Sequence, residues 1–325
     1  MTKREFVLGC AGILLAPLVA RAQRTVPLIG VLGARSAKVD AHLLAAFRQG
    51  LEAKGYIEGK NLEIAFRWAD GRYEGLPVLA AELVRLRPMA IVTTGGSASA
   101  LSAKSATGSI PIVFSVGGDP VKLGLVRNLG RPDANLTGVT VYSAALDQKR
   151  LELLHELVPA AKVIATLINP TNPSGADQLR EAHAAAGLLS QRLHVLTAKS
   201  EREIDDAFEM LGSLRIEALA VASDSFFISQ RQKIIAQAAK RRLPTVYPIR
   251  EFADAGGLLS YGTDFARMYR VLGEYAGQIL RGVPVADLPL QQPTTYELVI
   301  NLRTARNIGL KIPQTVLARA DRVIE

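Results

Sequence analysis

The residues with the clearest binding chemistry lie in short loops of small and polar side chains. One of them, Thr94-Gly95-Gly96-Ser97, leads directly into a run that is expected to be helical. Backbone N–H groups at the start of a helix attract a carboxylate or a phosphate, and the hydroxyls of Thr94 and Ser97 add further hydrogen-bonding groups. We therefore expect this loop to hold an anionic group of a ligand. The alternative is a tight turn in which Ser97 only caps the helix.

Other loops of the same kind carry carboxylates, an amide and aromatic rings. Asp119 and Asp224 suit a ligand amine, but these two residues and Asn169 suit a helix cap or a turn equally well. Tyr261 is expected either to pack against the body of a ligand or to fill the core between two lobes. The candidate ligand-binding residues are Arg35, Thr94, Gly95, Gly96, Ser97, Gly118, Asp119, Asn169, Asp224, Phe226 and Tyr261.

Motifs for catalysis, metals and cofactors are not found in the sequence. There is no phosphate-binding G-x-x-x-x-G-K-[ST] motif and no G-x-G-x-x-G after the first strand. The run 95–99 lacks the second glycine of a nucleophile elbow, and the four histidines lack the spacing of metal ligands. We predict no catalytic residue, no metal site and no cofactor. The enzymatic alternative is a cleft hydrolase or isomerase with Asp119 and Asp224 as an acid–base pair.

The elements that carry these loops alternate between strand and helix along the chain. Strand-like runs are expected at 26–32, 61–68, 89–94, 110–115, 136–141, 162–168, 193–197, 218–222, 245–247, 257–260 and 296–302. Helical periodicity predicts helices at 39–54, 74–86, 97–106, 121–129, 146–157, 174–190, 201–214, 228–241 and 265–280. Such alternation is typical of parallel sheets covered on both faces.

The alternation restarts after about residue 141, which favours two Rossmann-like α/β lobes over one large sheet. In open parallel sheets, ligands bind beyond the carboxyl ends of the strands, where the candidate loops lie. The fold prediction is therefore two lobes with parallel sheets and a central ligand cleft. A single (β/α)8 barrel is the structural alternative.

The first residues have the layout of a secretory signal peptide. Lys3 and Arg4 precede an apolar stretch at 6–19, and Ala20-Arg21-Ala22 forms a cleavage site before Gln23. The stretch is shorter than the about 20 residues that span a bilayer. We expect residues 1–22 to be removed and the protein to be periplasmic, by either the general or the twin-arginine export route. The alternatives are a buried core helix or a retained anchor.

Charge and cysteine content narrow the function classes further. The formal net charge is +9, but lysine and arginine are scattered, with the longest cluster at 240–242. We therefore expect no nucleic-acid partner. The single cysteine, Cys10, lies within the predicted signal peptide, so the mature chain is expected to fold without disulfides.

Several short motifs, in this order, resemble those of ABC-transporter substrate-binding proteins with the type 1 periplasmic binding fold, a group that includes aromatic amino-acid binders. The matching stretches are FRQGL at 47–51, GYIEGKN at 55–61, IPIVF at 110–114, GDPV at 118–121, NLTG at 135–138, ILRG at 279–282 and LVINL at 298–302. Each motif is short, but they are distributed in this order along most of the mature chain.

The resemblance implies capture of a small molecule by hinge closure and its transfer to an ABC permease in the inner membrane. Hinge strands would cross near 138–141, 261–263 and 290–294. Lobe 1 would comprise 23–140 with 263–292, and lobe 2 would comprise 141–262 with 293–325. The expected solute is an amino acid or another small carboxylate, a class that includes aromatic compounds. The binding protein is expected to be a monomer. A sensor that signals to a membrane receptor is the remaining alternative.

Overall fold

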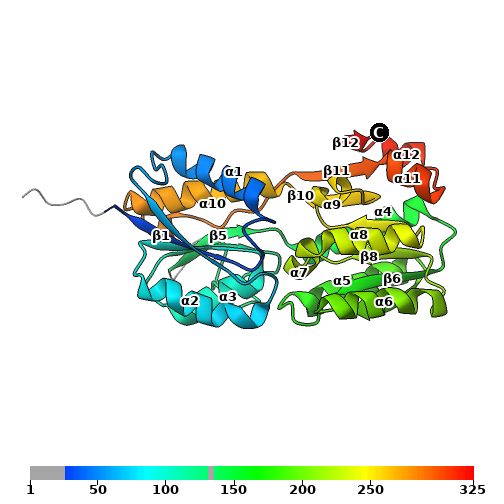
Figure 1. The fold of residues 1–325 in the computed structure, drawn as a ribbon, viewed down its shortest axis with the longest axis horizontal. Helices are drawn as coiled ribbons and strands as arrows, with labels where there is room; N and C mark the ends of the chain where they lie inside the picture. The colour runs from blue at the N-terminus through cyan, green and yellow to red at the C-terminus, as the bar shows by residue number, and fades with distance from the viewer. Residues whose placement is uncertain (1–25, 131–134) are drawn as a thin grey trace, which may run out of the picture.

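The computed structural model describes residues 26–130 and 135–325, which form two α/β lobes lying side by side (Figure 1). Lobe 1 contains a five-stranded sheet in the order β2-β1-β3-β4-β5. Lobe 2 contains a seven-stranded sheet in the order β12-β11-β10-β9-β8-β6-β7. The two separate sheets confirm the predicted fold class and rule out a single barrel. The predicted signal peptide, 1–22, lies outside the described residues.

Lobe 1 has helices on both faces of its sheet, with α1 and α10 on one face and α2 and α3 on the other (Figure 1). Its strands are β1 (Leu28–Gly33), β2 (Glu63–Trp68), β3 (Ala90–Thr94), β4 (Ile112–Val116) and β5 (Leu136–Thr140). Its helices are α1 (Ala41–Glu52), α2 (Leu76–Arg85), α3 (Ser97–Ala106) and α10 (Phe265–Leu280), with 3-10 turns η1 (Tyr73–Gly75) and η2 (Val285–Asp287). Strands β3 and β4 are buried along their whole length, as expected for a doubly covered sheet.

Lobe 2 is covered in the same way. Its strands are β6 (Val163–Ile168), β7 (Arg192–Thr197), β8 (Ala218–Val221), β9 (Thr245–Tyr247), β10 (Leu259–Thr263), β11 (Tyr296–Asn301) and β12 (Arg322–Ile324). Its helices are α4 (Ser143–Leu157), α5 (Gly175–Leu188), α6 (Glu201–Ser213), α7 (Ser225–Ser229), α8 (Arg231–Lys240), α9 (Arg250–Asp254), α11 (Leu302–Ile308) and α12 (Gln314–Leu317). Successive residues of β6 belong to different hydrophobic clusters, because side chains alternate between the faces of a strand.

Three connections join the lobes, and the third explains a departure from strictly parallel pairing. The chain passes from β5 to α4, returns from β10 to α10, and crosses again through residues 281–295 into β11. Because β10 runs toward lobe 1 and β11 comes back from it, the two strands pair antiparallel. The other strand pairs described for the two sheets are parallel.

Two predicted helices are wrong in detail. Residues 121–129 form turns instead of a helix, because Gly124 adopts a left-handed backbone (φ 67°) directly after the first turn. The predicted helix at 228–241 is two helices, α7 and α8, which meet at Gln230. The strand at 296–302 is not the last, since β12 follows and pairs with it.

Candidate functional site

A cavity lies between the two lobes, at the carboxyl ends of strands from both sheets. Its empty volume is ≈ 540 Å³, part of which is open to solvent. Lobe 1 contributes Arg35, Tyr73, Gly95, Gly96, Ser97, Ala98, Ser115, Val116, Gly117, Phe265 and Met268. Lobe 2 and the first crossing contribute Val141, Ser143, Asn172, Ser174, Ser223, Asp224, Ser225 and Ile228. The wall therefore combines an apolar surface with a smaller set of hydroxyl and backbone polar groups, as ligand sites commonly do.

The glycine loop after β3 forms one wall of the cavity. Gly95 and Gly96 both have positive φ, at 82° and 93°, and a Cβ at Gly95 would lie 2.7 Å from that of Ala34. The N-cap of α3 is Gly96, with no side-chain cap bond, so the alternative of Ser97 as the cap is wrong. The hydroxyl of Ser97 instead lies 3.1 Å from that of Ser174 in the opposite lobe. The first N–H groups of α3 thus lie at the cavity wall, and no side chain caps them.

Asp224 is buried and combines a structural role with a place in the cavity wall. Its Oδ1 caps α7 by accepting hydrogen bonds from the N–H groups of Phe226 (2.9 Å) and Phe227 (3.2 Å). Oδ1 also accepts from Nδ2 of Asn169 at 3.1 Å, and Oδ2 accepts from the Tyr73 hydroxyl of lobe 1 at 2.7 Å. Burial raises the pKa of Asp224, although these hydrogen bonds oppose the shift. The cap alternative holds for Asp224, and the same carboxylate joins the two lobes.

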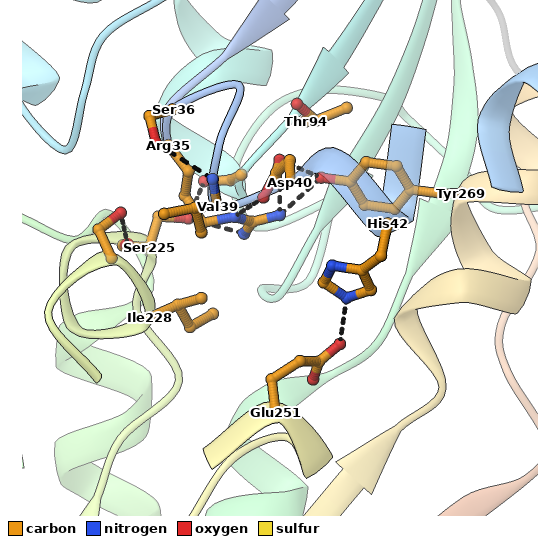
Figure 2. Close-up of polar contacts among 12 residues, drawn as sticks. Arg35, Ser36, Val39, Asp40, His42, Thr94, Ser225, Ile228, Glu251 and Tyr269 are labelled. Atoms are coloured by element: carbon orange, nitrogen blue, oxygen red, sulfur yellow. Dashed lines mark hydrogen bonds and ion pairs between the residues drawn. The ribbon is translucent and has the colours of Figure 1, made fainter. Parts of the chain in front are cut away.

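Arg35 lies at the centre of a buried polar cluster at the edge of the cavity (Figure 2). Its Nε and Nη2 donate to the two carboxylate oxygens of Asp40, and Nη2 also donates to the Tyr269 hydroxyl at 2.6 Å. Nη1 donates to Oγ of Ser225 in lobe 2 at 3.3 Å. Burial lowers the pKa of Arg35, but its pairing with Asp40 and contact with Tyr269 outweigh this and raise it. Arg35 is therefore charged and already neutralised within lobe 1.

The candidate residues from the sequence separate into three groups. Five line the cavity: Arg35, Gly95, Gly96, Ser97 and Asp224. Thr94, Asn169 and Phe226 are buried behind its wall. The remaining three lie elsewhere, as follows: Gly118, Asp119 and Tyr261.

Gly118 and Asp119 line a neighbouring hollow that shares Gly117 and Ser174 with the main cavity. Asp119 accepts hydrogen bonds there from the N–H groups at 121 and 122, as a turn former does. Asp119 and Asp224 therefore line different cavities. They do not face one shared site, as the acid–base pair of the enzymatic alternative would. Tyr261 packs against Tyr296 at a ring-centroid distance of 6.1 Å, beside the core of lobe 2.

Several lining residues were not identified from the sequence. Tyr73 follows β2 in the turn η1 and contacts Asp224 and Ser225 across the cleft. Ser174 is the N-cap of α5 after β6, and Ser225 is the first residue of α7 after β8. All three follow the carboxyl ends of strands, so the same positional rule that selected the other loops points to them.

Comparison with known proteins identifies the family. The model of the family described as ABC transporter substrate binding protein matches residues 38–324. The chain belongs to this family. Family membership confirms the resemblance in the sequence motifs, and it implies a small-molecule ligand and a transporter permease as partner.

Individual relatives agree with this assignment. The substrate-binding protein is 27% identical over 265 residues to a tyrosine-binding protein of Clostridioides difficile, covering 82% of this chain and 76% of the relative. A conserved domain protein from Vibrio cholerae superposes with a TM-score of 0.85 at 27% identity, covering 92% of this chain and 100% of the other. An ABC domain from Streptococcus pneumoniae in complex with L-Trp superposes with a TM-score of 0.82 at 26% identity, covering 91% and 100%.

Two structural features are absent from residues 26–130 and 135–325. No helix in this part of the substrate-binding protein is long and apolar enough to cross a membrane. Within the same residues, no group of three or more histidine, cysteine, aspartate or glutamate side chains is arranged to hold a metal ion.

Proposed function

We propose that this substrate-binding protein captures an amino acid, or a similar small carboxylate with an aromatic body, between its two lobes. The observation that carries the proposal is the start of α3, where uncapped N–H groups meet the cavity. These groups would bind the ligand carboxylate, with help from the helix dipole. The relatives that bind tyrosine and are solved with L-Trp support this class of ligand.

The rest of the cavity suits the other parts of such a molecule. Asp224 and the Tyr73 hydroxyl would accept the ligand ammonium, while Ile228, Phe265 and Met268 provide an apolar surface for its side chain. Of the hydrogen bonds described above, only that from Tyr73 uses Oδ2 of Asp224, so the second lone pair of this oxygen would accept from the ammonium. Closure of the lobes would then bury the ligand between groups of both lobes, which favours the closed state.

The proposal includes the cellular setting of the protein. Residues 1–22 would be removed at Ala22–Gln23, and the mature protein would act in the periplasm as a monomer, with the lobe boundaries given by 23–140 with 263–292 and 141–262 with 293–325. It would deliver its solute to an inner-membrane permease, catalyse no reaction and bind no nucleic acid. The connections at 141–142, 264 and 281–295 would act as the hinge.

The proposal is tested by calorimetry and thermal unfolding of residues 23–325 with L-tryptophan, L-tyrosine, 3-phenylpropionate and aliphatic amino acids. A compound at 100 times its dissociation constant should stabilise the fold by about 2.7 kcal/mol. The compound should be recovered unchanged, because consumption would instead indicate an enzyme. If none of these compounds binds, the proposed ligand class is wrong.

Two variants of Ser97 test the role of the α3 N–H groups. Proline is tolerated at the first helical position, where it removes one N–H group. Ser97→Pro should weaken binding of the identified compound about tenfold or more, since a hydrogen bond to a charged group contributes about 1.5–3 kcal/mol. Ser97→Ala, the matched control, keeps the N–H and should weaken binding less. Equal losses in both variants would show that the backbone N–H does not hold the ligand.

A further inference from the structure

One contact between the lobes lies outside the ligand cavity and involves two ionisable side chains. Nε2 of His42, in the first turn of α1, lies 2.9 Å from Oε1 of Glu251 in α9 (Figure 2). α1 belongs to lobe 1 and α9 to lobe 2, so the contact exists only while the lobes are closed. Neither residue lines the cavity. The contact therefore acts on closure without touching the solute.

Glu251 has little other support on its side chain. It is 15% exposed, whereas His42 is 51% exposed. Within the described residues, the second oxygen of Glu251, Oε2, is buried and accepts no hydrogen bond. Burial acts to raise the pKa of Glu251, but the hydrogen bond from His42, the backbone N–H of Glu251 itself and the charges of His42 and Arg35 outweigh it and lower that pKa. The carboxylate is therefore ionised and relies on a donor from the opposite lobe.

The other charged groups near this contact are already paired. Asp40 and Tyr269 hold the guanidinium of Arg35. The remaining charged residues of α9 also have partners, in the following pairs: Arg250 with Glu297, and Asp254 with Arg322. The partner of Glu251 in this contact is a histidine, the side-chain type whose charge generally changes between about pH 5 and 8.

We propose that His42 and Glu251 form a clasp outside the cavity that stabilises the closed lobes, so that solute is held more tightly at acidic than at alkaline pH. The proposal rests on the proposed function, since it assumes that closure retains a solute. His42 and Glu251 would thus help to set the affinity for a solute although neither lines the cavity. On opening, both side chains would exchange their contact for water.

The direction of the pH effect follows from linkage. Closing places the imidazole of His42 against the carboxylate of Glu251, and a protonated imidazole makes a stronger hydrogen bond to a carboxylate than a neutral one does. Closure is therefore favoured when histidine is protonated, and this advantage is lost as the pH rises through the range of histidine titration. A charge-assisted hydrogen bond is about twice as strong as a neutral one, so we expect roughly a two- to tenfold tighter affinity at pH 5.5 than at pH 8.0.

The affinity test measures the dissociation constant of L-tryptophan by calorimetry at both pH values. His42→Gln keeps a hydrogen-bond donor but cannot titrate, so its ratio of dissociation constants between the two pH values should lose the clasp contribution. Glu251→Gln should lose it as well. His183→Gln is the matched control, because His183 is exposed on α5, and its ratio should equal that of the wild type. Titration of Asp224 would act equally in all variants and cancels in this comparison. An unchanged ratio in His42→Gln overturns the proposal.

A second measurement tests the clasp without any solute. Spin labels on Val78→Cys in α2 and Met210→Cys in α6, both exposed, report the distance between the lobes in residues 23–325. The population at the shorter, closed distance should increase from pH 8.0 to pH 5.5 in the wild type and not in His42→Gln. If L-tryptophan fails to bind while this shift occurs, the ligand assignment is wrong and the clasp stands. If the two proteins give the same distances at both pH values, the clasp is wrong.

Discussion

Replacing Asp40 by asparagine should strongly destabilise lobe 1, because it leaves a buried guanidinium without its counter-charge. Arg35 and Asp40 are 2% and 0% exposed, and two hydrogen bonds of 2.5 and 3.0 Å join them. The Tyr269 hydroxyl donates to the same carboxylate at 2.8 Å. Although Asp40 is the N-cap of α1, its side chain makes no cap bond. The carboxylate thus serves Arg35 instead of the helix.

The expected magnitude follows from the burial of the pair. Removing one partner of a buried ion pair costs about 3–5 kcal/mol, since the remaining charge stays desolvated. The matched control is Asp206→Asn in α6, whose partner Arg202 lies 3.9 Å away with side chains 60% and 91% exposed. Exposed pairs contribute about 0.2–1 kcal/mol, so the control should be close to wild type.

The assay is urea unfolding at pH 7 without solute, followed by circular dichroism. If Asp40→Asn lost no more free energy of unfolding than Asp206→Asn, the Arg35–Asp40 pair would not be what stabilises this cluster. The double variant Arg35→Met with Asp40→Leu separates charge from shape. Apolar residues of similar volume often replace a buried ion pair without loss, so the double variant should be more stable than Asp40→Asn.

Two further predictions concern packing and pH. A Cβ on Gly273 would lie 2.1 Å from the carbonyl oxygen of Phe47, so Gly273→Ala should force α10 away from α1 and cost about 1–3 kcal/mol. A Cβ on Gly212 in α6 would have no atom within 4 Å, so Gly212→Ala should stabilise the protein by about 0.5–1 kcal/mol. Thermal unfolding measures both variants, and a similar loss of stability in the two would contradict this difference. Burial raises the pKa of Asp147 from 3.8 to about 6 despite Arg150, so its stabilising contribution is present at low pH and is lost as the pH rises through about 6. The free energy of unfolding of the wild type relative to Asp147→Asn, measured by urea unfolding, should therefore fall between pH 4 and pH 7. If the free energies of the two proteins changed in parallel with pH, the raised pKa would be refuted.

Sequence periodicity predicted the two-lobe fold because strand and helix repeats are local properties of the chain. Buried strands such as β3 and β4 are nearly continuous apolar runs, and their positions follow from composition. Local backbone conformation was harder to predict. The segment 121–129 has apolar residues with helical spacing, but Gly124 adopts a left-handed conformation, and the segment forms turns instead of a helix. A glycine allows this conformation without requiring it.

The site was only partly predictable, because a cleft requires knowledge of which loops face each other. The rule for parallel sheets identified the loops at 94–97 and 223–226, each within one lobe. It did not predict that Tyr73 would reach Asp224, since this contact joins residues 151 positions apart across the cleft. Tyr261 was chosen as an aromatic residue at the end of a strand, but it packs against Tyr296 beside the core of lobe 2.

The contacts that hold the lobes together explain why closure should depend on a solute. They include single hydrogen bonds from Tyr73 to Asp224 and from Ser225 to the carbonyl of Gly95. Such bonds are exchanged for bonds to water when the lobes separate, so the neutral bond contributes about 0.5–1.5 kcal/mol and the bond to the carboxylate about 1.5–3 kcal/mol. The strong ion pair of the region, Arg35 with Asp40, lies within lobe 1 and is kept in either state. A solute that contacts both lobes can shift the equilibrium between open and closed lobes by its differential affinity for the two states.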